Sequence, residues 1–326
     1  MKLEGVRKVH KNKRSLYALM LYYAVILLVM LVIARTFFTP SNFNSIFRST
    51  ATTLVAALGM MLVLVIGEID VSVGAILAMC CVICGKLTLA GVPLMGCILA
   101  SMAVGAIMGF INGLVVTFLH LDSIVATLGL LSIYKGIRII WTNGEWITGF
   151  SKEFLSLGQE AFLGINRSIY ITIMVLLVIY ILTTKTTFGR NCYAVGTNAE
   201  SAKLSGINVR RVKILAFIIC GVLVGLSAVM YTSRFGSVQS NTGNGWEMTI
   251  ISACVVGGTS TAGGEGEAFS VALGSILVSA LTTLLVFLGI DSLWQEAVQG
   301  MIILLSVCTY SIRMPSLKRK SMGGKV

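Results

Sequence analysis

A few acids, amides and tryptophans interrupt long apolar stretches of this sequence, and they are the residues best suited to chemistry. Glu68 and Asp70 stand in the sequence G-E-I-D-V-S, between two apolar runs. A carboxylate in the hydrocarbon of a membrane costs about 2.5–3.5 kcal/mol or more, so both must face protein, water or an interface. Two interpretations remain open: a short cytoplasmic turn in which Asp70 or Ser72 caps the next helix, or an interrupted helix beside a solute path.

A second polar group lies in the sequence N-T-G-N-G-W-E-M, which contains Asn241, Asn244, Trp246 and Glu247. Two amides, a carboxylate and an aromatic ring offer the hydrogen bonds and the flat surface that bind a sugar or another polyol. Trp246 can equally serve as an anchor at a membrane interface. Trp141 leaves the same two possibilities open.

The segment 185–213 carries six Lys or Arg and one acid, Glu200, and apolar segments flank it on both sides. Within it, Ala199–Leu204 can form a short helix, with Asn198 able to cap its start and Gly206 able to end it. Such a helix would present charged side chains to a soluble partner. The alternative is an ordinary cytoplasmic loop, for which the positive charge alone would suffice.

The sequence contains no recognisable catalytic or nucleotide-binding motif. Gly144-x-x-x-x-Gly149-Phe150-Ser151 has the glycine spacing of a phosphate-binding loop but lacks its lysine. H-E-x-x-H, G-x-S-x-G and clusters of metal ligands are also missing from the sequence. We therefore expect no catalytic residue, no metal and no cofactor in this chain. Energy for uphill transport would have to come from another subunit or from an ion gradient.

The composition predicts an integral membrane protein. The chain is 56% hydrophobic and 12% charged over 326 residues, with a mean hydropathy of +0.91, whereas a soluble domain carries about 25% charged residues. Of the 25 Lys and Arg, 17 fall in the three segments 2–14, 185–213 and 313–325, each of which borders an apolar run. This distribution follows the positive-inside rule and argues against nucleic-acid binding.

Apolar segments of nearly membrane-spanning length recur along the chain, since a crossing helix needs about 20 residues. We predict an all-α polytopic membrane protein of about ten segments, the eighth too short to cross unaided: Leu16–Ala34, Thr52–Ile66, Val73–Ala90, Leu94–Leu119, Ile124–Trp141, Ile169–Leu182, Ile214–Tyr231, Met248–Val256, Phe269–Leu288 and Trp294–Ile312.

The number of crossings agrees with the positions of the basic segments. A basic tail at 1–15, a membrane domain at 16–312 and a basic tail at 313–326 place both termini and the loop 184–213 in the cytoplasm. The polar segments 35–51, 142–168 and 232–247 then lie outside.

Glycines recur at the spacing that lets two helices approach closely in lipid. Gly105, Gly109 and Gly113 share one face of the fourth segment, and Gly221 and Gly225 share one face of the seventh. The pattern predicts a tightly packed helix bundle and indicates no particular substrate.

Four sequence segments, in this order and at these distances, resemble the permease subunits of ATP-binding-cassette sugar importers of the ribose, xylose and galactoside kind. They are G-E-I-D-V-S-V-G at Gly67–Gly74, I-V-A-T-L-G at Ile124–Gly129, F-G-R-x-x-Y-A-V-G-x-N within Phe188–Ile207, and G-G-T-S-x-x-G-G-x-G at Gly257–Gly266. Trp141–Gly149 and Asn241–Met248 are most similar to the autoinducer-2 and rhamnose branch of that family. The chain departs from the fourth motif at Glu267 and Ser270.

The resemblance implies how such a chain would work. The segment around Glu200 fits the spacing E-A-A-x-x-x-G of an importer coupling loop, with Ser201 in place of one alanine. It implies that coupling to a separate ATPase, which binds ATP and Mg²⁺, depends on a set of loop residues: Gly189, Arg190, Gly196, Asn198, Glu200, Ala202 and Gly206. The other implied partners are a second permease subunit, identical or related, and an external solute-binding protein.

The resemblance also implies the cargo and the location of such a chain: a monosaccharide or autoinducer-2, carried across the inner membrane. A set of polar and aromatic residues could line its path: Glu68, Asp70, Trp141, Asn241, Asn244, Trp246 and Glu247. Two alternatives remain open. One is an ion-coupled transporter of a small polar solute, which would need an intramembrane acid or histidine relay. The other is a membrane scaffold that only docks the binding protein.

Overall fold

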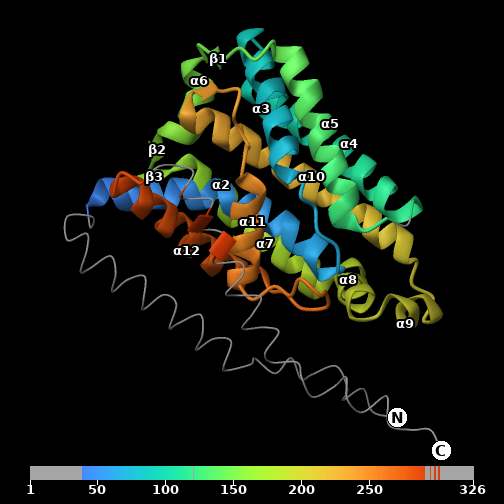
Figure 1. Cartoon of the computed structure of the whole chain (residues 1–326). Coiled ribbons are helices and arrows are strands. Elements are labelled where there is room, and N and C mark those ends of the chain that lie inside the picture. Colours follow the sequence, from blue (N-terminus) through green and yellow to red (C-terminus); the bar gives the residue numbers. More distant parts are fainter. Residues whose placement is uncertain (1–38, 120, 291–293, 295–296, 299, 302–326) are drawn as a thin grey trace, which may run out of the picture.

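The computed structural model describes residues 39–119, 121–290, 294, 297–298 and 300–301, in which helices account for most of the chain (Figure 1). The helices are α2 (Pro40–Val65), α3 (Val73–Leu89), α4 (Leu94–Phe118), α5 (Ser123–Thr142), α6 (Lys152–Gln159), α7 (Arg167–Lys185), α8 (Thr187–Thr197), α9 (Ala199–Leu204), α10 (Val209–Phe235), α11 (Trp246–Val256) and α12 (Ala268–Phe287). The strands have two residues each: β1 (Ile147–Thr148), β2 (Ala161–Phe162), β3 (Ile165–Asn166) and β4 (Ser237–Val238).

Six of these helices, α2, α4, α5, α7, α10 and α12, are long and apolar enough to cross a membrane. The apolar helices α3 and α11 are shorter, with 17 and 11 residues, so the short eighth segment is confirmed. The prediction of a mostly helical, multi-pass membrane protein is confirmed as well. The first predicted crossing and most of the tenth lie outside the described residues, as do both basic tails. The total of ten therefore stays a prediction.

Helix α2 begins twelve residues before the predicted start of the second segment, so much of the polar segment 35–51 is helix rather than loop. Thr39 caps its start by accepting a hydrogen bond from the amide of Asn42, and Pro40 occupies the first turn. Its polar residues find partners: Arg48 bonds to the side chain of Asn44 and to the carbonyl of Gln159. Side-chain capping and these contacts let the helix extend past its apolar part.

Helix α2 forms the centre of the bundle. Every side chain from Thr50 to Ile66 is buried, and α7, α10, α11 and α12 all pack around it. By contrast, α4, α5 and α7 keep long apolar faces exposed. In a membrane such faces need no protein cover, because lipid replaces water around them.

The most extensive contact joins α4 and α10 through the predicted glycine faces. A Cβ added to Gly105 or Gly109 would overlap the carbonyl oxygen of Gly221 or Phe217, and one added to Gly225 would overlap that of Ser101. The hydroxyl of Ser101 donates a hydrogen bond to the carbonyl of Gly225 at 2.8 Å. Backbone contact of this kind maximises dispersion attraction between helices in lipid.

Helices α8 and α9 lie at one end of the bundle, here called the α9 end, and β1 and α6 lie at the opposite, α6 end (Figure 1). Helix α10 runs to the α6 end, where β4 pairs with β1 in antiparallel fashion. The chain then turns back through 239–245 to the start of α11. A helical path is thus broken at two places inside the bundle: at the connection between α2 and α3, and at the segment 239–245 before α11.

We expect Gly109→Ala to destabilise the protein, because the added methyl group would meet the carbonyl of Phe217 on α10. Gly129→Ala is the matched control, since no atom lies within 4 Å of a Cβ at this helical glycine. Alanine favours helix over glycine by about 1 kcal/mol, so the control should be neutral or stabilising. Thermal unfolding of both purified variants in detergent checks this. Equal unfolding midpoints for the two variants would show that the contact between α4 and α10 tolerates the added methyl group.

Candidate functional site

The break between α2 and α3 places a buried carboxylate inside the bundle. The Asp70 side chain is 1% exposed and accepts hydrogen bonds from the amide and the hydroxyl of Ser72, at 2.9 and 2.7 Å. The side-chain amide of Asn112 on α4 donates to Asp70 at 2.8 Å and to the Ser72 hydroxyl at 2.7 Å. The Tyr134 hydroxyl on α5 donates to the Asn112 oxygen at 2.9 Å. We call Asp70, Ser72, Asn112 and Tyr134 the Asp70 network.

The donors to Asp70 are neutral. Within the part of the chain that the structure describes, the ion pairs are Arg167–Glu160 and Lys213–Glu68, and neither includes Asp70. The carboxylate instead lies beside the first turn of α3, where the helix dipole favours negative charge. The network thus fastens the start of α3 to α4 and α5.

Both interpretations of G-E-I-D-V-S contain a correct element. Asp70 does bond to the backbone at the start of α3, as the turn interpretation expects, whereas Ser72 makes no side-chain cap. The second half of the turn, Asp70–Ser72, is buried among helices, and the amides of Ile69 and Val71 bond to Ser123 and Thr127 on α5, at 3.0 and 3.1 Å. This is the broken helical path of the second interpretation.

A buried arginine holds the second break in place. Arg138 on α5 is 3% exposed, and its guanidinium donates hydrogen bonds to the carbonyls of Thr242 and Ser240, both at 2.7 Å. These carbonyls belong to the segment 239–245 that returns into the bundle before α11. A helical arginine and backbone oxygens therefore position this segment.

The two breaks meet at Gly74, in the first turn of α3. A Cβ added there would overlap the carboxylate of Glu247 and the carbonyl of Gly243. Glu247 is buried, whereas the side chains of Asn241 and Asn244 are exposed, and Trp246 contacts the ring of Tyr231 edge to face at 5.9 Å. The chain folds one group of predicted path residues, Asp70 and Asn241–Glu247, around the start of α3.

Glu68 and Trp141 do not join this group. Glu68 pairs with Lys213 near the start of α10. Trp141 lies at the end of α5, where the Lys86 ammonium donates to its carbonyl at 3.2 Å and lies 4.6 Å from the centre of its ring. The position of Trp141 fits the interface-anchor interpretation better than a place beside Asp70.

Four site residues were not among the predicted ones: Asn112, Tyr134, Arg138 and Lys213. The first three are polar side chains within predicted crossings, and such residues are costly in lipid unless they have a structural or functional partner. A polar side chain inside a predicted crossing was therefore the sequence signal that could have identified these three residues. Their partners lie between 22 and 145 residues away in sequence, which no local pattern specifies.

The segment 184–213 folds into two short helices with predicted and additional caps. Asn198 caps α9 by accepting from the amide of Ser201 at 2.8 Å, and Gly206 follows the helix with φ of +84°. Thr186 caps α8, and Asn208 caps α10. The predicted helix Ala199–Leu204 and both of its predicted ends are confirmed.

Helix α8 packs by its backbone against the break after α2. A Cβ on Gly196 would overlap the carbonyl of Val65 and the amide of Gly264, and those two groups share a hydrogen bond of 2.9 Å. The Tyr193 hydroxyl donates to the carbonyl of Gly266 at 2.7 Å. Burial raises the pKa of Tyr193 to about 12, so its hydroxyl stays a donor at neutral pH. The glycine-rich segment 257–266 therefore serves tight packing here.

The outer surface of α9 combines charged side chains with one exposed apolar side chain. Ala202 is buried, Glu200 and Lys203 are exposed, and Leu204 is 90% exposed. Arg190 on α8 is exposed as well, whereas Gly189 is buried, and a Cβ there would overlap the carbonyls of Leu182 and Thr183. The predicted coupling residues divide accordingly: Glu200 and Arg190 face outward, and Gly189, Gly196 and Ala202 pack inward.

A helical membrane bundle with a buried polar site between broken helices, and an exposed charged helix at one end, has the architecture of a membrane permease. The chain belongs to the family described as "Branched-chain amino acid transport system / permease component", whose model matches residues 42–307. It is 35% identical over 306 residues to the "Autoinducer 2 import system permease protein LsrC" of Escherichia coli (strain K12 / DH10B), covering 93% of this chain and 88% of that protein.

Other relatives carry the same name and have a similar sequence identity to this chain. The proteins of the same name from Salmonella choleraesuis (strain SC-B67) and Yersinia pestis (strain Pestoides F) are each 36% identical, over 82% and 84% of this chain and 77% and 78% of theirs. No solved structure matches the chain. The family and the apolar helices together make this a multi-pass protein of the cell membrane.

We expect Asn112→Leu to destabilise the protein by about 1–3 kcal/mol, because it leaves the Oδ2 oxygen of the buried Asp70 without its donor and removes the acceptor that Asn112 offers to Tyr134. Tyr134→Phe, which removes a single donor, should cost about 1 kcal/mol. Thermal unfolding of the purified variants measures both. The exchange Asp70→Asn with Asn112→Asp restores an acid–amide pair and should recover part of the loss. Wild-type stability of Asn112→Leu would contradict the network.

Proposed function

We propose that this chain is the permease subunit of an ATP-binding-cassette importer that carries autoinducer-2, or a similar monosaccharide-like ligand, across the inner membrane. The relatives named above as autoinducer-2 import permeases support the ligand class. A ribose-type sugar remains the competing cargo within this proposal. The chain itself performs no hydrolysis.

The observation that carries the proposal is the backbone contact between α8 and the end of α2. Force applied to α9 passes to α8, and Gly196 transmits it to Val65, seven residues from Ser72. Any tilt of α2 would displace the start of α3 and with it the Asp70 network. A docking helix that rests on a broken helix is the arrangement that coupling requires.

The partner at the α9 end is a soluble ATPase that binds ATP and Mg²⁺. Leu204 would enter an apolar groove on it, while Glu200, Lys203 and Arg190 would pair with charges around that groove. The α9 end and both termini would then be cytoplasmic, in keeping with the basic segments and the positive-inside rule. The α6 end would face an external solute-binding protein, and Asn241 and Asn244 would be reached from that side.

A second permease subunit, identical or related, would cover the outward face of α5. Gly129 and Gly136 have no atom within 4 Å of a built Cβ, and Ser132 is exposed between them. Lys135 is half-exposed and has no ion pair among residues 39–119 and 121–290. A lysine and three small residues suit a protein neighbour and a polar path better than hydrocarbon.

An ion-coupled transporter is the second candidate, because the buried acids Asp70 and Glu247 meet its requirement for an intramembrane carboxylate. The bonding of Asp70 argues against this role. The donors to its carboxylate come from Ser72 and Asn112, neither of which ionises, so these bonds form no relay that could pass a proton on.

Reconstitution tests the proposal. In liposomes that contain this chain, its ATPase and its binding protein, we expect autoinducer-2 uptake that requires ATP and persists without ion gradients. Leu204→Ser should lower ATP-driven uptake about tenfold, since a buried leucine contributes about 1.5–3 kcal/mol. Met95→Ser removes a side chain that is 64% exposed on α4 and serves as the control. Gradient-driven uptake without ATP would favour the ion-coupled alternative. Uptake of ribose but not of autoinducer-2 would identify a ribose-type sugar as the cargo.

The second-permease surface can be tested by photo-cross-linking. A photoreactive amino acid in place of Ser132 should give an adduct with the mass of two permeases in the assembled complex. The same residue in place of Met174, which is 59% exposed on α7, should give lipid adducts only. Permease adducts from position 174 but not from 132 would place the interface on α7 instead.

A further inference from the structure

The hairpin of β2 and β3 exposes apolar side chains at its tip. Leu163 is 83% exposed, Phe162 57% and Ile165 45%. The two turn residues, Leu163 and Gly164, have φ values of +50° and +79°. Two-residue turns with both φ values positive favour Asn-Gly, because the left-handed conformation crowds a side chain such as leucine. In water this tip would combine backbone strain with exposed apolar area.

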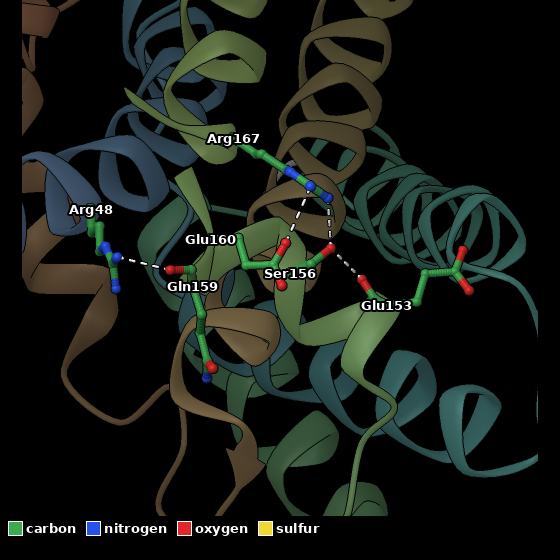
Figure 2. Close-up of polar contacts among 6 residues, drawn as sticks. All are labelled: Arg48, Glu153, Ser156, Gln159, Glu160 and Arg167. Carbon is green, nitrogen blue, oxygen red and sulfur yellow. Dashed lines mark hydrogen bonds and ion pairs between the residues drawn. The ribbon is translucent and has the colours of Figure 1, made fainter. Parts of the chain in front are cut away.

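Two arginines fix the base of the hairpin to membrane-crossing helices. Figure 2 shows Arg167 of α7 reaching Glu160, at 3.2 Å, and the Ser156 hydroxyl, at 2.8 Å. Arg48 of α2 donates to the carbonyl of Gln159 at 2.9 Å. The hairpin therefore cannot swing freely relative to α2 and α7, and the orientation of its tip is a property of the fold.

The tip continues an apolar strip along α7. The Tyr170 hydroxyl donates to the carbonyl of Phe162 at 3.0 Å, and the two rings meet edge to face at 6.3 Å. Beyond Tyr170, the exposed side chains of α7 up to Ile181 are all large and apolar: Ile173, Met174, Leu177, Val178 and Ile181. The hairpin tip is the end of a surface that runs along a membrane-crossing helix.

We propose that the tip of this hairpin lies in the boundary between lipid headgroups and acyl chains, with Phe162, Leu163 and Ile165 in contact with lipid. Aromatic and branched apolar side chains suit this boundary, and the exposed charges of Glu160 and Arg167 at the hairpin base suit the headgroup layer. Contact with lipid also removes the apolar area of Leu163 from water, which accounts for a leucine at a position suited to asparagine.

The anchor would tie the end of α10 to the membrane surface. The side chain of Gln159, next to the hairpin, donates to the carbonyl of Arg234 at 3.2 Å. Gly158 packs so closely on Arg234 that a Cβ would overlap its amide. Helix α10 would therefore move at its α9 end while its α6 end stays at a fixed depth. This inference is independent of the ligand and of the ATPase.

Spin labelling of the full-length chain in lipid nanodiscs tests the anchor. A nitroxide on Leu163→Cys should collide more often with oxygen, which dissolves in lipid, than with a water-soluble nickel chelate. Leu204→Cys, at a 90% exposed position on α9, is the matched control and should show the reverse preference. The seven described cysteines are buried, and labelling of the wild-type chain gives the background.

Two outcomes would overturn the proposal. A preference for nickel at position 163 would place the tip in water, and protection from both reagents would place it under protein. A second variant separates anchoring from folding: Leu163→Asn suits the turn and should fold, yet a label on Ile165→Cys in that background should lose its preference for oxygen. An unchanged preference would also count against the anchor.

Discussion

Hydrocarbon offers no hydrogen bonds, and the rest of this structure depends on that constraint. Every break in a helical path exposes amides and carbonyls that must find partners inside the protein. The break after α2 is satisfied by Ser123 and Thr127 of α5, and its acid is satisfied by Ser72 and by Asn112 of α4. The break before α11 is satisfied by Arg138. The polar interior is therefore a consequence of broken helices as much as of any ligand.

Close backbone packing is the second device of the fold. Glycines let α4 approach α10, and they let α8 approach the end of α2 and the segment 257–266. The first contact lies inside the bundle and the second at its α9 end. In both, glycine has no side chain, so the two backbones touch directly. Such contacts transmit displacement, because no flexible side chain lies between the two elements. The helix pair α8–α9, which we propose docks the ATPase, is thus joined by direct backbone contact to the broken helix beside Asp70.

The two ends of the bundle differ in how they are held. At the α9 end, capped short helices carry exposed charge around Leu204, which suits a protein surface. At the α6 end, a hydrogen bond from Arg48 and an ion pair and a hydrogen bond from Arg167 fix a small hairpin with an apolar tip (Figure 2). Both surfaces contain an exposed leucine, but the neighbouring residues are charged in one case and part of an apolar helix face in the other. Their surroundings differ accordingly.

The sequence alone determined the membrane class, the family resemblance and most helix boundaries, because apolar length and composition are local properties. It also determined the caps of α9, since Asn198 and Gly206 act within one turn of the helix. Only the tertiary structure decided which polar residues meet. Asp70 and Asn112 are 42 residues apart, and Arg138 and Thr242 are 104 apart. Such pairs form because helix packing brings them together, and no spacing in the sequence encodes that approach.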